Sequence, residues 1–91
     1  MAKVLVVLKV TPEDIEIDLD KIVEAVKQKM PETYELLRYE KVPVAFGLYF
    51  LRLYIAIPEE EEGGTEKLEK IIKGIEGVSE IEVELLHRLG F

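Results

Sequence analysis

Two helical segments with the same pattern of residue types divide this chain into two similar halves. The segments "LDKIVEAV" (19–26) and "LEKIIKGI" (68–75) share the order Leu, acid, Lys, Ile, branched aliphatic, two free positions, branched aliphatic. Each follows a strongly apolar segment with the composition of a strand and precedes a more polar one. This repetition predicts two βαβ halves, each with a crossover helix.

Four segments have the alternation and the β-branched content of strands. They are residues 3–10, 33–41, 47–57 and 78–86. The segments 3–10 and 47–57 are the most apolar, whereas the mixed pattern of 33–41 is typical of a sheet edge. Right-handed crossovers in both halves place the two apolar strands in the centre of the sheet, in the order 4-1-3-2. We therefore expect a ferredoxin-like α+β sandwich, βαββαβ, with two helices on one face of an antiparallel sheet, and residues 1–91 as a single domain.

Alternation along the strands assigns side chains to the two faces of the sheet. The face toward the helices is expected to carry Val4, Val6, Leu8, Val10, Tyr49, Leu51, Leu53, Ile55, Ile57, Ile81, Val83 and Leu85. The opposite, open face is expected to carry Leu5, Val7, Phe50 and Tyr54, next to Glu80, Glu82 and Glu84 of the last strand. Aromatic rings on this face stack bases in RNA-recognition modules, but there they lie among basic residues. The acidic neighbours favour a protein partner or self-association over RNA.

Short polar residues, a proline and two glycines mark the ends of the helices. Asp18 is expected to cap the first helix, and Pro31 stops it. Thr65 is expected to cap the second helix, which Gly74 and Gly77 end.

The composition restricts the classes of partner. The 91 residues carry a net charge of −7 at pH 7 without a basic cluster, which makes nucleic acid a poor partner. The absence of cysteine excludes disulfides, thiolate nucleophiles and zinc-thiolate sites. The N-terminal "MAKVLVVLKV" reads as a strand and not as a signal peptide, and the apolar run 42–57 is too short to span a bilayer. We therefore expect a cytoplasmic protein that binds neither nucleic acid nor a membrane directly.

Residues that could carry catalysis are scarce. His87 is the only histidine and has no companion ligand, so we expect a solvated side chain and not a metal site. The chain has no asparagine and no GxxxxGK[ST] loop, which an acylphosphatase-type enzyme and a phosphate-binding loop would respectively need. The glutamate run 59–62 is interpreted as a solvated loop and not as a cation site. No catalysis, metal or cofactor is predicted. Three alternatives stay open: a regulatory module that binds a small ligand at a dimer interface, a binder of single-stranded RNA, and a minimal enzyme such as an acylphosphatase.

The stretch "VPVAFG" (42–47) leaves one question open. Phe46 lies just outside the third predicted strand, so its ring either plugs the end of the core or stands at a loop tip where a partner meets it. Pro43 and Gly47 are interpreted as turn formers.

Three motifs together resemble those of archaeal translation elongation factor 1-beta. They are "PVAFGL" before the third strand, "GIEGVSEIEV" leading into the last strand, and the terminal "HRLGF". The resemblance covers essentially the whole chain. It implies the ferredoxin-like fold and guanine-nucleotide exchange: the factor promotes GDP release from the GTPase elongation factor 1-alpha so that GTP can reload. The oligomeric state stays open between a monomer and a weak homo-oligomer.

The resemblance also implies a cationic contact at the C-terminus. In eukaryotic relatives a lysine one residue before the C-terminal leucine acts near the Mg²⁺ site of the GTPase. The ending "HRL" puts Arg88 at the position of this lysine and Leu89 at that of the leucine. This chain departs from the pattern because arginine replaces lysine and two residues follow. The residues alone favour a solvated arginine near a frayed terminus over a contact, and the resemblance reverses this preference.

A second contact is implied at the turn before the third strand. The family's Phe-Gly turn, here Phe46 and Gly47, presses on the GTPase at the opposite end of the same contact surface. Phe50 and Tyr54 on the open sheet face are weaker candidates for the same interface.

Overall fold

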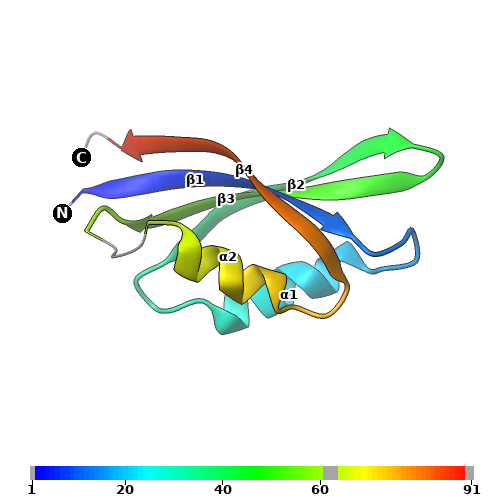
Figure 1. The fold of residues 1–91 in the computed structure, drawn as a ribbon, viewed down its shortest axis with the longest axis horizontal. Coiled ribbons are helices and arrows are strands. Elements are labelled where there is room, and N and C mark those ends of the chain that lie inside the picture. Colours follow the sequence, from blue (N-terminus) through cyan, green and yellow to red (C-terminus); the bar gives the residue numbers. More distant parts are fainter. Residues whose placement is uncertain (1, 61–63, 90–91) are drawn as a thin grey trace.

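The two halves of the chain fold as the repeated pattern predicts. The computed structural model describes residues 2–60 and 64–89. Its elements are β1 (Lys3–Pro12), α1 (Leu19–Lys29), β2 (Glu35–Ala45), β3 (Leu48–Pro58), α2 (Glu66–Lys73) and β4 (Val78–Leu89). The antiparallel strands lie in the order β2-β3-β1-β4, which is the predicted 4-1-3-2 taken from the other edge. Both helices cover the same face of the sheet (Figure 1), so the ferredoxin-like βαββαβ arrangement is confirmed.

Helix α1 begins and ends where its sequence predicts. The side chain of Asp18 accepts a hydrogen bond from the backbone N–H of Asp20 at 2.9 Å and so caps the first turn. Lys27 and Lys29 lie in the last turn, where positive charge complements the helix dipole, and Pro31 follows. The helix therefore has defined ends on both sides.

Helix α2 has the predicted limits but a different first turn. Thr65 occupies the cap position, yet its hydroxyl donates to Oε2 of Glu69 at 2.6 Å and makes no capping bond. Gly74 ends the helix, and Gly77 follows with φ +96°. A Cβ at Gly77 would lie 3.1 Å from the side chain of Ile17, so both the backbone angle and the space favour glycine there.

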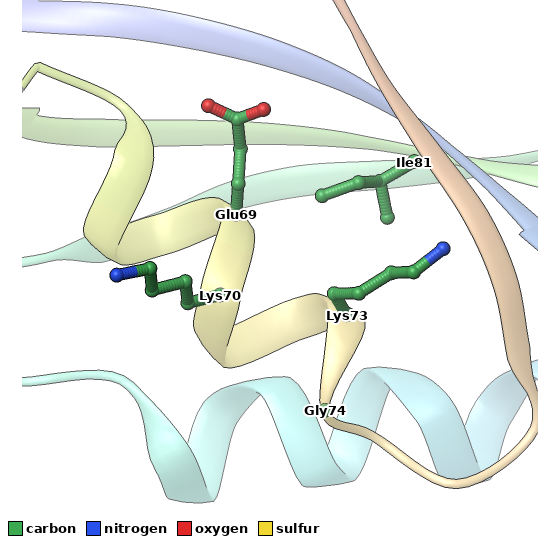
Figure 2. A pocket seen from close by; sticks show the side chains of 5 residues that line it. All are labelled: Glu69, Lys70, Lys73, Gly74 and Ile81. Atoms are coloured by element: carbon green, nitrogen blue, oxygen red, sulfur yellow. The ribbon is translucent and has the colours of Figure 1, made fainter.

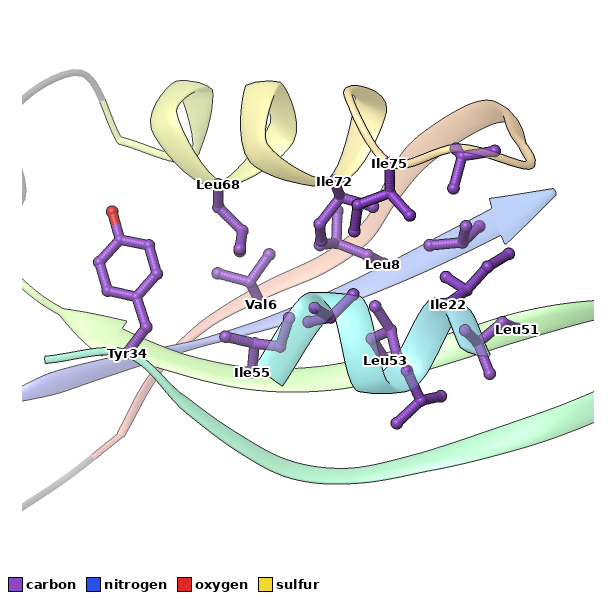
Figure 3. Packing of buried hydrophobic residues seen from close by; sticks show 14 of the residues in the cluster. Val6, Leu8, Ile22, Tyr34, Leu51, Leu53, Ile55, Leu68, Ile72 and Ile75 are labelled. Atoms are coloured by element: carbon purple, nitrogen blue, oxygen red, sulfur yellow. The ribbon is translucent and has the colours of Figure 1, made fainter. Parts of the chain in front are cut away.

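The core lies between the helices and the central strands. Ile22 and Val26 of α1, with Leu68 and Ile72 of α2, belong to one buried cluster with the helix-side residues of β1 and β3 (Figure 3). Tyr34, which precedes β2, is also buried in this cluster. The alternation of β1 and β3 thus assigned the core side of the sheet correctly from Val6 to Val10 and from Leu51 to Ile57.

Strand β2 continues four residues beyond its predicted end. Pro43 lies within the strand, opposite Tyr49, so its interpretation as a turn former is wrong. An edge strand tolerates proline because one side of its backbone needs no ladder hydrogen bond. The hairpin formed by β2 and β3 extends past the helices (Figure 1), and Tyr49, expected in the core, is 45% exposed there. The buried side of β3 begins at Leu51 instead.

Strand β4 is longer than predicted and contains a β-bulge. Val83 lies opposite Leu8 and Leu85 lies opposite Val7, so Glu84 is an extra residue in the ladder. The bulge moves Leu85 to the open face, where it is exposed, and the prediction of a core-side Leu85 is wrong. Beyond the bulge the pairing continues to Leu89.

Candidate partner-binding site

The turn between β2 and β3 consists of Phe46 and Gly47 alone. Ala45 lies opposite Leu48, and the two turn residues have φ +51° and +80°, as in a type I′ hairpin turn. The Phe46 side chain is fully exposed, at 102% of its reference area. This exposure excludes the core-plug alternative, and the positive φ of Gly47 confirms its role as a turn former.

Phenylalanine is an unfavourable residue for this turn position. A residue with a Cβ in the left-handed region loses about 1–2 kcal/mol relative to the right-handed one, and Asn, Asp and Gly are the usual occupants. The exposed ring of Phe46 gains no burial in the chain to offset this strain. Neither the turn nor the core therefore explains an aromatic residue at this position.

Other exposed apolar side chains surround the turn. We call Ile15, Val44, Phe46 and Tyr49 the hairpin-end surface; all four are exposed. Ile15 and Tyr49 line the same small hollow with Gly47, although Ile15 comes from the loop between β1 and α1. The sequence reasoning did not assign Ile15 or Val44 to a site. The available signal was an isolated isoleucine between Asp14 and Glu16 in an otherwise acidic connection.

Arg88 lies inside β4 and not in a frayed end. Its backbone pairs opposite Val4, whose side chain faces the helices, so Arg88 projects on the helix side of the sheet. Nε of Arg88 donates to Oε2 of Glu59 at 3.1 Å, and the side chain is 72% exposed. Within residues 2–60 and 64–89 this is the only recorded partner of the guanidinium. Leu89 is partly buried opposite Lys3.

The two implied contact residues occupy opposite ends of the molecule. Arg88 on β4 pairs with Val4 on β1, and Val4 pairs with Ile57 on β3, so the three residues lie side by side across the sheet. Ile57 is eleven residues from Phe46 along the hairpin. At about 3.3 Å per residue this corresponds to a separation of about 35 Å. The longest dimension of the fold is 42 Å. A partner that touches both residues must therefore extend along the whole sheet.

The aromatic rings of the open face are covered by cations of the same chain. Nζ of Lys9 lies 4.8 Å from the centroid of the Phe50 ring, and the guanidinium of Arg52 lies 5.4 Å from it. The guanidinium of Arg38 lies 4.5 Å from the centroid of the Tyr54 ring. These cation–π contacts occupy the ring faces on which a base would stack. The open face therefore lacks the bare aromatic platform of an RNA-recognition module.

Carboxylates complete this network. The hydroxyl of Tyr54 donates to Oε1 of Glu40 at 2.5 Å, and Nη2 of Arg38 lies 3.1 Å from the same oxygen. The hydrogen bond from Tyr54 and the charges of the arginines lower the pKa of Glu40. Nε of Arg52 donates to Glu84 at 3.0 Å, which raises the pKa of Arg52. Strands β2, β3 and β4 are thus linked across the open face.

The variant Glu40→Gln is expected to be less stable than wild type at neutral pH and equally stable in acid. The pKa of Glu40 in the folded protein lies below its ordinary value of 4.5, so the unfolded chain binds this proton more tightly. The resulting stabilisation is present above the unfolded-state pKa and is lost as the pH falls through the folded-state pKa. Urea unfolding of both proteins at pH 7 and at successively lower pH measures the difference. A difference that stays constant into strong acid would contradict this assignment.

A shallow hollow lies between α2 and β4 (Figure 2). Its lining residues are Glu69, Lys70, Lys73, Gly74 and Ile81. Glu69 accepts the hydrogen bond from Thr65, and Nζ of Lys73 donates to the backbone oxygen of Ser79 at 2.7 Å. Glu69 and Lys73 therefore serve contacts within the chain.

Neither a cluster of metal-binding side chains nor a membrane-spanning helix is present among the residues that the structure describes. Among those that the structure describes, no group of three or more His, Asp or Glu side chains is placed to hold a metal ion. Residues 61 and 62 of the predicted acidic loop lie outside the described residues. No helix in the described part of the chain is both long and apolar enough to cross a bilayer.

Comparison with known proteins defines the class to which this fold and site belong. The family model of the EF-1 guanine nucleotide exchange domain matches residues 5–89. Among solved structures, BlrP1 BLUF aligns with a TM-score of 0.57 at 13% identity, over 100% of this chain and 57% of that chain, which shows a similar fold alone. The chain is therefore a guanine-nucleotide exchange domain.

Full-length relatives specify the family further. Elongation factor 1-beta of Ignicoccus hospitalis is 59% identical over 91 residues, covering 100% of this chain and 97% of the relative. The protein of the same description from Hyperthermus butylicus is 60% identical over 89 residues, covering 98% and 97%. That from Sulfolobus acidocaldarius is 52% identical over 88 residues, covering 97% and 98%. The chain belongs to the elongation factor 1-beta family, as its motifs predicted.

This membership gives the chain its function. It is an exchange factor of protein synthesis that acts on the GTPase elongation factor 1-alpha, and it is not an enzyme.

Proposed function

We propose that the whole chain, residues 1–91, acts in the cytoplasm as one exchange domain that contacts elongation factor 1-alpha at two ends. Phe46 and the hairpin-end surface form one contact, and Arg88 forms the other. The observation that carries this assignment is the Phe46 side chain, which is fully exposed in a strained turn. Family membership supplies the partner for such a ring.

Exchange requires contacts that favour the nucleotide-free GTPase. A GTPase holds GDP through a phosphate-binding loop and Mg²⁺. A factor that binds the empty state better than the GDP-bound state weakens GDP binding by the same factor, because the two equilibria are linked. A 10⁴-fold weakening corresponds to about 5.5 kcal/mol of differential binding. The two proposed contacts must together contribute on this scale.

Arg88 would supply the electrostatic part of this difference. Its guanidinium is exposed and bonds to Glu59 through Nε, which leaves the two terminal amino groups to face a partner. Such a planar group can donate two parallel hydrogen bonds to one carboxylate or phosphate. Placed beside the Mg²⁺ site of the GTPase, the positive charge disfavours return of the metal. We propose this role for Arg88, with Leu89 packing next to it against the partner.

Phe46 would supply the apolar part. A phenylalanine at the tip of a two-residue turn can enter a pocket without moving the strands behind it, and the positive φ of Gly47 permits the turn. Ile15, Val44 and Tyr49 would extend the apolar contact around it. Aromatic anchors of this kind dominate many protein interfaces.

Phe50 and Tyr54 are proposed as supporting residues of the interface. Their rings are held under the cations of the open face. A partner on this face would therefore meet the charged groups above the rings, with the aromatic residues fixing those groups in place.

Release of a fluorescent GDP from elongation factor 1-alpha tests the proposal. Substoichiometric amounts of the full chain are expected to accelerate release in excess unlabelled nucleotide, because an exchange factor turns over. The negative reference is spontaneous release without the factor. A rate that stays at the spontaneous value at micromolar factor would refute the exchange assignment.

A further inference from the structure

Leu86 is an exposed leucine on the side of the sheet that the helices cover. It pairs with Val6 on β1, whose side chain is buried in the core, so Leu86 projects to the same side of the sheet. Leu86 is nevertheless 59% exposed. Ile81 and Val83, which precede it on this side of β4, pack against the core. The helices therefore cease to cover β4 between Val83 and Leu86.

A small hollow lies beside Leu86 at this end of the molecule, and we call it the Leu86 hollow. Its volume is about 160 Å³, and its lining is mostly apolar. Leu86 shares the apolar part of this lining with Val4, Ile57 and Pro58, and Glu59 and Thr65 belong to the polar part. An apolar cavity of about 150 Å³ accepts a molecule as large as benzene. The Leu86 hollow is therefore large enough for one apolar side chain of another protein.

Arg88 stands at the rim of the same hollow. It lies two residues beyond Leu86 on the same side of β4 and pairs with Val4, which lines the hollow. Its guanidinium bonds to Glu59, another lining residue, and stays 72% exposed. A partner group that meets this guanidinium therefore has an apolar hollow directly beside it.

The surroundings of Leu86 distinguish it from an ordinary surface leucine. Single exposed apolar residues are common on soluble proteins and need no special reason. Leu86, however, adjoins other apolar side chains in a hollow, next to a residue for which a charged contact with the GTPase is proposed. Protein interfaces commonly have an apolar centre with polar and charged groups at the rim. Leu86 and Arg88 have this arrangement.

We propose that Leu86 and the Leu86 hollow form a further apolar contact for elongation factor 1-alpha and receive an apolar side chain of the GTPase next to Arg88. This inference rests on the proposed role of Arg88, since that contact brings the partner to this side of β4. It also specifies the orientation of docking at this end: the GTPase meets the helix side of β4 and not the open face.

Leu85 is a matched control for Leu86. The two leucines are adjacent on β4, are 50% and 59% exposed, and lie on opposite faces of the sheet. Threonine at either position removes most of the apolar side chain and is favourable in a strand. Because both positions are exposed, the variants Leu85→Thr and Leu86→Thr are expected to unfold at similar urea concentrations.

Leu86→Thr is expected to raise about tenfold the concentration of factor needed for half-maximal GDP release, whereas Leu85→Thr should match wild type. This scale corresponds to burial of the exposed part of one leucine. Leu86→Met keeps an apolar side chain of similar volume and should retain most of the wild-type activity. Titration of nucleotide-free elongation factor 1-alpha with each variant should show the same order of affinities.

Equal behaviour of the two threonine variants would overturn the proposal. A larger defect in Leu85→Thr would also overturn it and would place the docking side on the open face. Arg88→Ala, measured in parallel, separates this inference from the proposed function. If Arg88→Ala impairs exchange and Leu86→Thr does not, only the role of the Leu86 hollow is wrong. If the wild-type chain itself gives no acceleration, the exchange assignment fails, and the titration still decides between the two leucines.

Discussion

Arg88→Ala is expected to abolish most of the acceleration of GDP release, whereas Arg88→Lys retains a measurable part. The alanine variant removes the exposed guanidinium, and with it the positive charge that would act beside the Mg²⁺ site of the GTPase. Lysine keeps the charge but cannot donate two parallel hydrogen bonds from a planar group. Release of fluorescent GDP at several Mg²⁺ concentrations measures the exchange activity of both variants. The defect should be largest at high Mg²⁺, where competition with the metal matters most.

The control for this variant is Lys67→Ala. Lys67 is exposed on α2, and the structure records no ion pair for it within the described residues. Its loss changes the net charge by the same amount as that of Arg88 and should leave exchange unchanged. If Arg88→Ala accelerates release as well as wild type does, the cationic contact has been assigned to the wrong residue, while exchange by the chain itself stands.

Phe46→Asn is expected to stabilise the fold and to weaken exchange. Asparagine followed by Gly47 is a preferred type I′ turn pair, so relief of the strained φ of +51° should raise the free energy of unfolding by about 1 kcal/mol. The same change removes the apolar anchor of the hairpin-end surface. The concentration of factor needed for half-maximal GDP release should therefore increase. Urea unfolding and nucleotide release, measured on one preparation, give the two opposite effects.

Leu37→Asn is a suitable comparison for this variant. Leu37 is another exposed apolar residue of β2, but it lies far from the turn, at the register shift between Leu36 and Arg38. Exchange by this variant should match wild type. A more stable Phe46→Asn protein with unimpaired exchange would show that the exposed ring has no role in binding.

The order of elements and the sheet topology could be predicted from the sequence because they depend on periodicity. The same helix pattern occurs twice in the chain, each time between two predicted strands. Buried positions such as Leu8 and Leu53 follow from the alternation of side chains along the strands. Helix α1 was also predictable in detail, since Asp18 and Pro31 act locally.

The errors occurred where an edge or a bulge relaxes the local rules. Pro43 favours a turn in isolation, but an edge strand accepts it. Leu85 was placed in the core because simple alternation cannot detect an extra residue in a strand. The adjacent Leu86 is also a leucine, so the sequence looks the same whichever of the two faces the helices. Tyr49 was expected to be buried because the sequence does not tell how far the hairpin extends past the helices.

The candidate site could be predicted only in part. The motifs indicated Phe46 and Arg88, but periodicity left the burial of Phe46 open because it lies between strands. The structure adds its positive φ and full exposure. Ile15 joins the same surface through folding of a loop distant in sequence, which no local pattern could indicate.

The roughly 35 Å between Phe46 and Arg88 would make the molecule a rigid bivalent ligand if both proposed contacts form. Hydrogen-bonded strands join the two ends and cannot stretch, so docking of one end would set the local concentration at which the other end meets its target. Avidity would then depend on whether the two docking places on the GTPase are separated by this same length. A GTPase conformation with a different spacing could keep only one end bound, and loss of the other contact would favour dissociation.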